Sequence, residues 1–210
     1  MLRSLFSAIS GLRNHQNYID VVGNNIANVN TSGFKYSQVT FRDVISQNVR
    51  GATPLSATTG PRNPVQIGLG MTLSAVEPIH TQGGLQYTGK ETDLAIQGNG
   101  FFILNSVDMA RTLYSRDGSF FVDPDGYLTH NATGFRLQGQ TGAIPVDGSV
   151  VSISIGEDGS IDGIMQDGTT TNYGQIELAY FPNPAGHMKA GNNMYSESSS
   201  SGPVAIGTPG

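Results

Sequence analysis

The clearest pattern in the chain is a stripe of apolar residues near its N-terminus. Positions 2, 5, 9, 12, 16, 19, 23 and 26 are spaced alternately by three and four residues, and six of these eight are Leu or Ile. This seven-residue repeat predicts an α-helix over residues 2 to about 28 that buries one narrow face against another helix. With two flanking residues that widen it, the stripe is named here the apolar seam: Leu2, Leu5, Phe6, Ile9, Leu12, Ile19, Val22 and Ile26.

The predicted helix needs a packing partner to be stable. Gly11 and Gly23 each cost about 1 kcal/mol in helix propensity relative to Ala, and a terminal helix with such penalties is marginal by itself. The sequence holds no second amphipathic helix of comparable length. Two interpretations follow. Either the helix packs on its own β domain, or the seam is a subunit-packing surface that pairs with other subunits or with a helix outside this sequence.

An Asn-rich stretch, residues 24–34, ends the helix, since Asn competes for backbone hydrogen bonds and Gly33 suits a positive φ. Residues 36–49 favour a short helical or extended piece around Phe41 and Val44. Residues 51–70 are rich in Gly, Pro, Thr and Ser without a sustained period. We therefore expect residues 36–80 to form an extended connector.

From about residue 71 to 181 the pattern is that of β-strands. Val151, Ile153 and Ile155 alternate with serines, and Ile176, Leu178 and Tyr180 alternate in the same way. Residues 101–104 are a continuous apolar run, typical of a strand buried on both faces. Turn signals separate these runs: Asp123-Pro124-Asp125-Gly126, Glu157-Asp158-Gly159 and Asp167-Gly168.

The predicted fold class is mainly β with an N-terminal α-helix. We expect an N-terminal helix and Asn-rich turn over residues 1–35, the connector over 36–80 and a small antiparallel β domain over 81–185. Residues 186–210, with their run of serines, read as an extended polar tail and as the point where a longer chain has been truncated.

Composition narrows the function classes. Charged residues make up 13% of the chain and the net charge is -5, which argues against a nucleic-acid partner. Residues 1–50 sum to +3 and the rest to -8. There is no Cys, so disulfides and thiolate chemistry are excluded. The apolar runs are too short for membrane insertion, and serines break the first of them, which argues against a secretory signal peptide.

The candidate catalytic and ligand-binding patterns are weak. Gly98-Asn99-Gly100 lacks the remaining features of a phosphate loop and favours a turn into a strand. Asp123-x-Asp125-Gly126 lacks the Glu of a calcium loop. The four histidines are widely spaced, and Arg116 with Asp117 predicts a local ion pair at a hairpin rim. We expect no enzyme activity, no catalytic residues, no metal and no cofactor.

Two long stretches resemble the flagellar hook and rod axial protein family. The first covers residues 1–35, especially Ala8–Leu12 and Asp20–Lys35; the second runs from Thr81–Leu85 through Asp93–Phe102 to Tyr114–Phe120. The positions that carry the family motif are Asn24, Asn25, Asn28, Gly33, Phe34, Asp93, Gly98, Gly100, Phe101, Phe102, Arg116 and Gly118. The stretches lie in collinear order, and the resemblance covers nearly the whole chain.

The resemblance implies a structural subunit of the bacterial flagellum. Members of this family place a terminal helix in the inner wall of a helical tube and a β domain outside it, and they leave the cell through the flagellar export apparatus. The implied partners are further copies in a helical homo-oligomer and neighbouring rod, hook-cap and hook–filament junction proteins. The implied location is the hook or basal body, extracellular or spanning the periplasm. A second, C-terminal helix is usual in the family and is not found in this sequence.

The sequence alone favours the hook over its alternatives. The wording of residues 8–12 and 23–26 resembles hook proteins, and the hook is a flexible joint that passes motor torque to the filament. A distal rod protein of the same family is the alternative. A more remote one is a β-rich adhesin or phage-tail-like module that is anchored by its helix and does not self-assemble.

Overall fold

The computed structural model describes residues 2–55, 60–107, 110–148 and 150–209. The chain divides into two compact units, which are treated separately. The first unit comprises Met1–Val29 and Tyr36–Ile79, and the second comprises Asn30–Lys35 and His80–Gly210. The backbone therefore passes between the units three times, after residues 29, 35 and 79.

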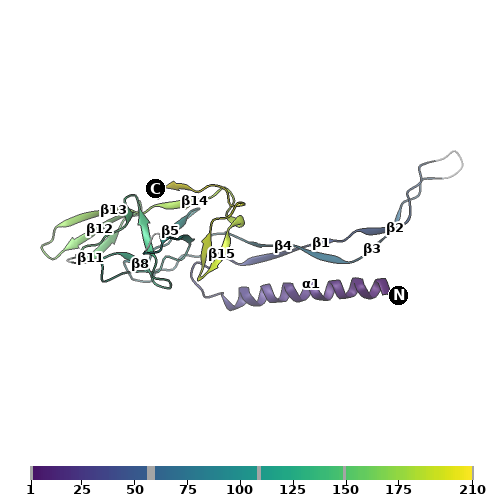
Figure 1. Ribbon diagram of the computed structural model, residues 1–210, viewed down its shortest axis with the longest axis horizontal. Coiled ribbons are helices and arrows are strands. Elements are labelled where there is room, and N and C mark those ends of the chain that lie inside the picture. Colours follow the sequence, from purple (N-terminus) through teal and green to yellow (C-terminus); the bar gives the residue numbers. More distant parts are fainter. Residues whose placement is uncertain (1, 56–59, 108–109, 149, 210) are drawn as a thin grey trace. The chain divides into compact units, whose positions relative to one another are not determined.

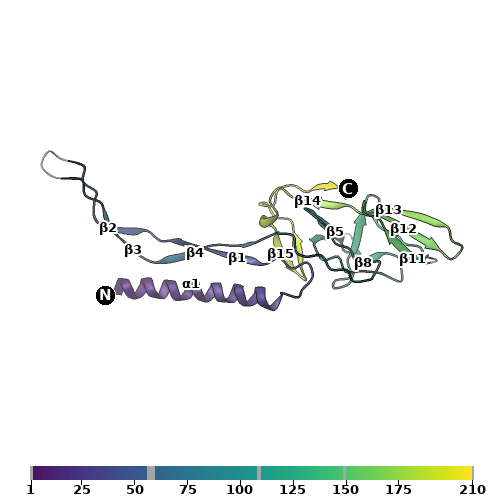
Figure 2. The ribbon, with the colours of Figure 1, turned by 180° about the vertical axis from the view of Figure 1, so that it is seen from behind.

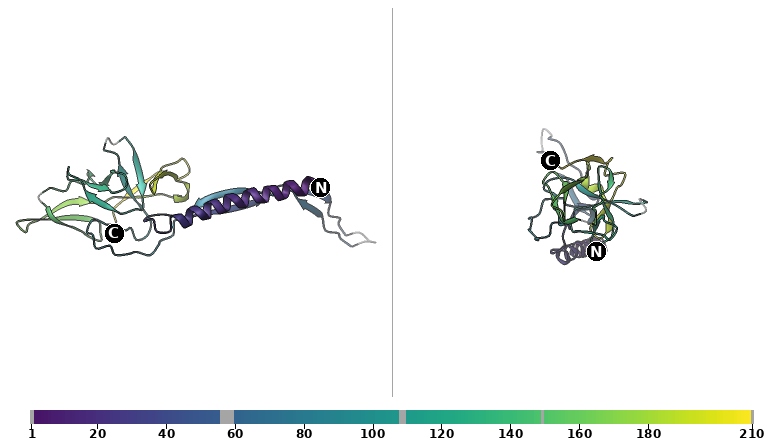
Figure 3. Two further views of the ribbon diagram at one scale, coloured as in Figure 1. Left: turned by 90° about the horizontal axis from the view of Figure 1, so that it is seen from below. Right: turned by 90° about the vertical axis from the view of Figure 1, so that its left-hand side faces the viewer.

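The first unit is a helix beside a two-stranded ribbon (Figure 1). Helix α1 covers Leu2–Ala27, as the apolar periodicity predicts. Strands β1 (Ser37–Asp43) and β4 (Met71–Pro78) pair antiparallel, and so do β2 (Ser46–Arg50) and β3 (Val65–Gly68). The view from below in Figure 3 shows the helix running along the ribbon. Among the described residues, no helix is long and apolar enough to cross a bilayer.

The expected connector over residues 36–80 is thus largely a β-ribbon. A bridge between Thr53 and Arg62 extends the pairing toward residues 56–59, which lie outside the described part of the chain. The ribbon escaped prediction because strands that bury little side-chain surface show no strong alternation: all four residues of β3 are exposed. Its strands are held mainly by backbone pairing, and Val39 of β1 is their buried apolar residue among those described.

The second unit is built from antiparallel strands. Within the described residues, ten strands form one sheet along the order β15-β16-β6-β5-β9-β8-β7, with β10, β14 and β17 attached to it, and three form a separate sheet, β11-β12-β13. The strands are β5 Phe101–Asn105, β6 Thr112–Ser115, β7 Phe120–Val122, β8 Leu128–His130, β9 Arg136–Gly139, β10 Gly142–Ala143, β11 Val150–Ile155, β12 Ser160–Met165, β13 Thr170–Gln175, β14 Leu178–Tyr180, β15 Met188–Gly191, β16 Met194–Ser196 and β17 Ala205–Gly207.

Strand β5 is the centre of this unit, and the prediction that it is buried on both faces is confirmed. Phe102 and Leu104 join a large core that also includes Ile153 and Ile161 of the smaller sheet. On the other face, Phe101 and Ile103 pack with Tyr114, Ala179 and Tyr195. The alternation of side chains along a strand sends successive apolar residues into two different clusters.

The predicted turns are confirmed. Asp123–Gly126 closes the β7–β8 hairpin through a hydrogen bond from the Gly126 N–H to the Asp123 carbonyl (2.8 Å). Gly159 and Gly168 stand at positive φ between β11, β12 and β13. Gly98 and Gly100 also have positive φ, immediately before β5, so their segment is a strand-entry turn.

Two expectations are wrong in detail. Val151 is 70% exposed, because the pairing of β11 with β12 shifts register between Val150 and Ser152, and Val150 packs on the core instead. The predicted polar tail is not a tail: β15, β16 and β17 lie inside it, and Met194 and Tyr195 are buried against β6. The serine run forms a turn in which the Ser201 hydroxyl is buried and donates to the Ser198 carbonyl (2.8 Å).

Candidate assembly surface

The apolar seam of α1 is exposed along most of its length. Among the described residues of the helix none is fully buried. Six seam side chains have exposed fractions between 55% and 72%: Leu2, Leu5, Phe6, Leu12, Ile19 and Ile26. Ile9 and Val22, the other two, are partly buried. An apolar row of this length in water is unfavourable, and such rows mark sites of protein–protein contact.

The seam is exposed because the opposite face of α1 packs on the ribbon. That face carries mostly small or polar residues, also spaced by three and four: Ser7, Ser10, Asn14, Tyr18, Val21, Asn25 and Asn28. At about 100° per residue the centres of the two faces are about 170° apart. The helix therefore has two distinct faces: one packs on the ribbon of the same subunit, and the other, the seam, is exposed.

Polar contacts hold the inner face to strand β4. The Asn14 side-chain amide donates to the Met71 carbonyl (2.8 Å), and the Ser10 hydroxyl accepts from the Met71 N–H (3.4 Å). Gly70, at a φ of +119°, faces the same turn of the helix, and a Cβ there would collide with the Ser10 hydroxyl. A glycine is therefore needed for the ribbon to approach the helix this closely.

Asn25 of the family motif acts as a cap on strand β1. Its side-chain amide donates to the Ser37 carbonyl (2.9 Å) and its side-chain oxygen accepts from the Ser37 N–H (3.0 Å), so it replaces a neighbouring strand. Asn28 donates to the Asn24 carbonyl (2.9 Å) at the end of the helix. Farther along, His15 and Tyr18 lie with their rings 5.7 and 6.2 Å from that of Phe41.

The inner face was missed by sequence reasoning. Its residues are mostly Ser and Asn rather than Leu and Ile, so a search for apolar periodicity passes over them. The signal that finds them is the spacing of small or polar residues in phase with the seam, seven residues apart at positions 7, 14, 21 and 28.

In the second unit, the motif residues near Gly33 fasten the segment 30–35 to the β domain. Gly33 has a φ of +68°, and a Cβ on it would lie 2.6 Å from the Asp117 backbone nitrogen. The Ser32 hydroxyl donates to the Asp117 carboxylate (2.8 Å), and Asn193 donates to the Ser32 carbonyl (2.9 Å). Segment and strands are in direct contact, and only glycine fits.

Asp117 pairs with His130, not with Arg116 as expected from the sequence. The His130 ring is fully buried and its Nε2 lies 3.4 Å from an Asp117 oxygen. Burial opposes ionisation of Asp117, but the nearby His130 ring and the hydrogen bond from Ser32 outweigh it and hold the pKa of this carboxyl below its usual range. Arg116 and Asp117 follow the end of β6, and the partner of Asp117 comes from β8, so it was not predictable from proximity in the sequence.

Arg116 instead braces the entry to β5. Its guanidinium donates to the Gly98 carbonyl (2.7 Å) and lies 5.1 Å from the centre of the Phe101 ring. A Cβ on Gly100 would lie 3.3 Å from the Tyr180 ring, so this turn is also tightly packed. The motif residues of this stretch therefore stabilise the fold.

Asp93 and Gly118 belong to a second close approach. Asp93 forms a β-bridge with Ser119, and the Leu94 N–H donates to the Gly118 carbonyl (2.8 Å). A Cβ on Gly118 would collide with the Leu94 carbonyl. Phe102, the remaining motif residue of this region, is in the core. The structure thus divides the motif between the end of the helix, the segment 30–35 and the start of β5.

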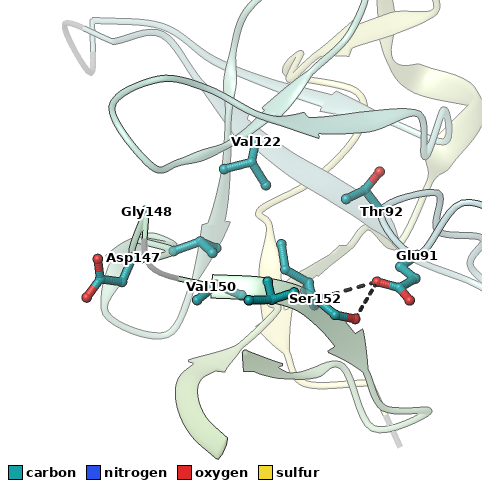
Figure 4. A pocket seen from close by; sticks show the side chains of 10 residues that line it. Glu91, Thr92, Val122, Asp147, Gly148, Val150 and Ser152 are labelled. Carbon is teal, nitrogen blue, oxygen red and sulfur yellow. Dashed lines mark hydrogen bonds between the residues drawn. The ribbon is translucent and has the colours of Figure 1, made fainter. Parts of the chain in front are cut away.

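A shallow cavity of about 290 Å³ lies beside β11 (Figure 4). Glu91 closes one side by accepting hydrogen bonds from the Ser152 hydroxyl (2.9 Å) and the Ile153 N–H (3.3 Å). Val122 and Val150 line the other walls. The carboxylate is used to fasten a loop to the sheet. Within the described residues, no three His, Cys, Asp or Glu side chains are grouped to bind a metal.

Comparison with known proteins gives two family matches. Residues 5–35 match the flagella basal body rod protein family, and residues 95–163 match the D1 domain of the flagellar hook proteins FlgE, FlgF and FlgG. The first match covers α1 and the Asn-rich segment, and the second covers the central strands of the β domain.

Individual relatives are similar over different lengths. The flagellar basal-body rod protein FlgG of Bacillus subtilis is 43% identical over all of this chain and 79% of its own length. In Borreliella burgdorferi, FlgG is 35% identical over all of this chain and 79% of its own length. The flagellar hook protein FlgE of the same bacterium is 52% identical, but over 66% of this chain and 31% of its own length.

The rod and hook relatives differ in how much of this chain they match. The sequence identity to the hook protein is higher than that to the rod proteins, but the hook match is limited to part of the chain. The rod matches cover all of it. The comparisons therefore support the rod alternative better than the hook preference. The names of these relatives describe structural parts of the flagellum.

Proposed function

Since this chain belongs to the flagellar basal-body rod and hook protein family, we propose that it is a non-catalytic subunit that builds the distal rod by self-assembly through helix α1. One observation carries the assembly mechanism: the apolar seam is exposed on the face of α1 opposite to the face that packs on the ribbon. The subunit has already used one face of the helix for its own fold, so the seam is available to other copies.

Burial of the seam supplies the driving force. Each Leu, Ile or Phe side chain that becomes fully enclosed contributes about 1.5–3 kcal/mol. Six such side chains are exposed on α1. Even their partial enclosure therefore offsets a substantial part of the free energy that association costs through lost translational and rotational freedom. An interface that joins one face of a copy to a different face of the next produces an open helical assembly when the rotation between copies does not close a ring.

The rod is preferred over the hook because the similarity to rod proteins spans the whole chain. In this proposal the segment of residues 1–35 is the axial element, and the β domain lies outside it. The other partners are neighbouring rod and hook components and the flagellar export apparatus. The location is the flagellum, which is where its relatives are found.

The test is a substitution in the seam of the full-length protein. Leu12→Asp places a charge in the middle of the seam, where the native side chain is 72% exposed. We expect a strain carrying it to lack completed rods in electron micrographs and to be non-motile, while circular dichroism of the purified variant stays unchanged. The matched control is Asn17→Asp, which adds the same charge at an exposed position of α1 outside the seam and should assemble normally.

Normal rods built from Leu12→Asp would contradict the seam mechanism. Deletion of the gene separates the two structural roles: loss of the distal rod supports this proposal, whereas a complete rod without a hook supports the hook. A deletion strain that is fully motile would contradict both.

A further inference from the structure

Negative charge is concentrated in one part of the second unit. Between residues 137 and 188 the sequence holds six carboxylates and no Lys or Arg: Asp147, Glu157, Asp158, Asp162, Asp167 and Glu177. Four of these, residues 157, 158, 162 and 167, lie on the strands or turns of the β11–β13 sheet, and Glu157, Asp158 and Asp167 are exposed. We call this sheet the acidic end.

Positive charge gathers elsewhere in the same unit, around Phe34. Lys35 follows Phe34 in the chain, and the Lys189 ammonium lies 5.4 Å from the centre of the Phe34 ring. Burial lowers the pKa of Lys35, and the charge of Arg116 lowers it further, so these two cations are close enough to repel each other. Lys35, Arg116 and Lys189 form what we call the basic patch.

The two charged regions lie at opposite ends of the second unit. Figures 1 and 2 show β11, β12 and β13 together at one end, and β15, which carries Lys189, at the other. The view from below in Figure 3 agrees. The end with β15 also carries the exposed carboxylate of Glu197, which follows β16, but the three cations of the basic patch outnumber it. The unit therefore has an electrostatic direction, with a negative end and a more positive end.

Two cations of the basic patch, Lys35 and Arg116, are held by neutral groups. In the described part of the chain, the Lys and Arg ion pairs join Arg136 to Asp123 and Asp125, and none includes Lys35 or Arg116. Lys35 donates to the Thr81 carbonyl, and Arg116 donates to the Gly98 carbonyl. A neutral acceptor orients these cations and leaves their charge able to attract a carboxylate.

We propose that the basic patch of one copy receives the acidic end of the next copy, so that the second units associate head to tail. The partner is another copy of this chain, because the same unit carries both complementary surfaces, and complementary potentials favour that register over its reverse. The inference rests on the proposed function in one respect, namely that the chain self-assembles. It adds a second contact, independent of the seam, which sets the direction of stacking.

Two charge-reversed variants of the full-length protein test this contact. The basic-patch variant is Lys35→Glu with Lys189→Glu. Arg116 is left unchanged because it stacks on Phe101 and braces the β5 entry.

The acidic-end variant is Glu157→Lys with Asp158→Lys and Asp167→Lys, all at exposed positions, so three of the four acidic-end charges are reversed and that end becomes positive. Asp162 is left unchanged because it accepts a hydrogen bond from Asn172. Each variant alone opposes like charges at every contact, and we expect at least about tenfold fewer completed rods per cell.

Expressing both variants together should restore assembly. An alternating polymer of the two has one native contact and one doubly reversed contact, and both are attractive. The matched control reverses two exposed cations outside the patch, Lys90→Glu with Arg111→Glu. It changes the net charge by the same amount as the basic-patch variant, and we expect it to assemble like the unaltered protein.

The outcomes are separable. Assembly of either reversed variant at the unaltered level, or no recovery on co-expression, overturns the head-to-tail contact while the seam proposal stands. A deletion strain with complete rods and hooks overturns the proposed function itself.

If circular dichroism shows that a Glu variant is misfolded, Lys35→Gln with Lys189→Gln replaces it. A smaller loss of rods, aggravated by added salt, is then expected, and no loss overturns the contact.

Discussion

Strand β5 and helix α1 are both rich in large apolar residues, and the fold treats them in opposite ways. All four residues from Phe101 to Leu104 are buried, divided between two clusters of the same unit. In α1 six of the eight seam side chains are exposed, and Ser10, Asn14 and Asn25 make hydrogen bonds with the ribbon. Apolarity therefore stabilises the subunit in one region, and in the other it is left exposed, where the proposed assembly would bury it against neighbouring copies.

The difference shows how an assembling protein remains folded before assembly. If the seam were packed inside the subunit, the ribbon would need an apolar face of its own, and the helix would be unavailable to other copies. Hydrogen bonds from small polar side chains orient α1 without using the seam. Polar pairing of this kind is modest in strength, about 0.5–1.5 kcal/mol for each bond, so the first unit has little stability to lose.

The largest expected effect is in the core of the second unit. Leu104→Ala removes a side chain with no exposed surface from the centre of the sheet, and we expect it to reduce the free energy of unfolding by about 2–5 kcal/mol. Urea unfolding followed by circular dichroism measures this loss. A loss below about 1 kcal/mol, well under that range, would show that β5 is not the structural centre inferred from its burial.

A smaller effect is expected where a polar side chain holds the first unit. Asn25→Ala removes both hydrogen bonds to Ser37, and we expect a loss of about 1–3 kcal/mol confined to the first unit. Hydrogen exchange of the β1 amides should accelerate while that of β5 is unchanged. Equal acceleration in both units would contradict the separation of the two regions.

A pH effect of similar or smaller size is expected from His80 in the second unit. Burial, reinforced by the charges of His187, Lys35 and Arg116, lowers the pKa of His80 from 6.5 to about 4, although a backbone hydrogen bond to Pro184 opposes this. The unfolded chain takes up the proton below pH 6.5 and the folded chain only near pH 4. Stability is therefore present above pH 6.5 and is lost as the pH falls from 6.5 to 4.

Since His80 is partly exposed to solvent, the loss should be about 1–2 kcal/mol, less than the full shift implies. Thermal unfolding at several pH values measures it, and His80→Gln should make the curve flatter over this window. The slope rather than the absolute stability is compared, so that a packing change in the variant does not decide the outcome. An identical slope in both proteins would assign the acid sensitivity to other groups.

The smallest effect on stability, paired with the largest effect on assembly, is expected in the seam. Leu12→Ser replaces a side chain that is 72% exposed, and the free energy of unfolding of the isolated subunit should change by no more than about 0.5 kcal/mol. Urea unfolding of the purified subunit measures the change. A loss comparable to that of Leu104→Ala would show that the seam is packed within the subunit and would remove the distinction between the two regions.

Sequence reasoning succeeded where a single residue type or a strict period determines the structure. The repeat of Leu and Ile gave the helix, the run Phe101–Leu104 gave the doubly buried strand, and the Asp-Gly turns gave the hairpins. It failed where structure depends on partners distant in the chain. The Asp117–His130 pair joins residues 13 positions apart, and the supposed tail is ordered because Tyr195 pairs with Tyr114 of β6.

The same distinction holds for the candidate surface. The seam residues are visible in the sequence because apolar side chains are recognisable wherever they point. The exposure of these side chains cannot be read from the sequence, because it depends on which face of α1 packs on the ribbon. The small polar residues of that inner face carry no strong signal. Periodicity identified the helix, and only the coordinates show which side of it the ribbon covers.

The threefold passage of the backbone between the units has a mechanical consequence. A chain that crossed once would concentrate any pulling or twisting load on a single flexible link. Here the crossings after residues 29, 35 and 79 divide the load among three covalent connections, and the segment 30–35 is anchored at Ser32 by side-chain bonds to Asp117 and Asn193. Because three links act in parallel, no one of them bears the whole of a load applied between the units.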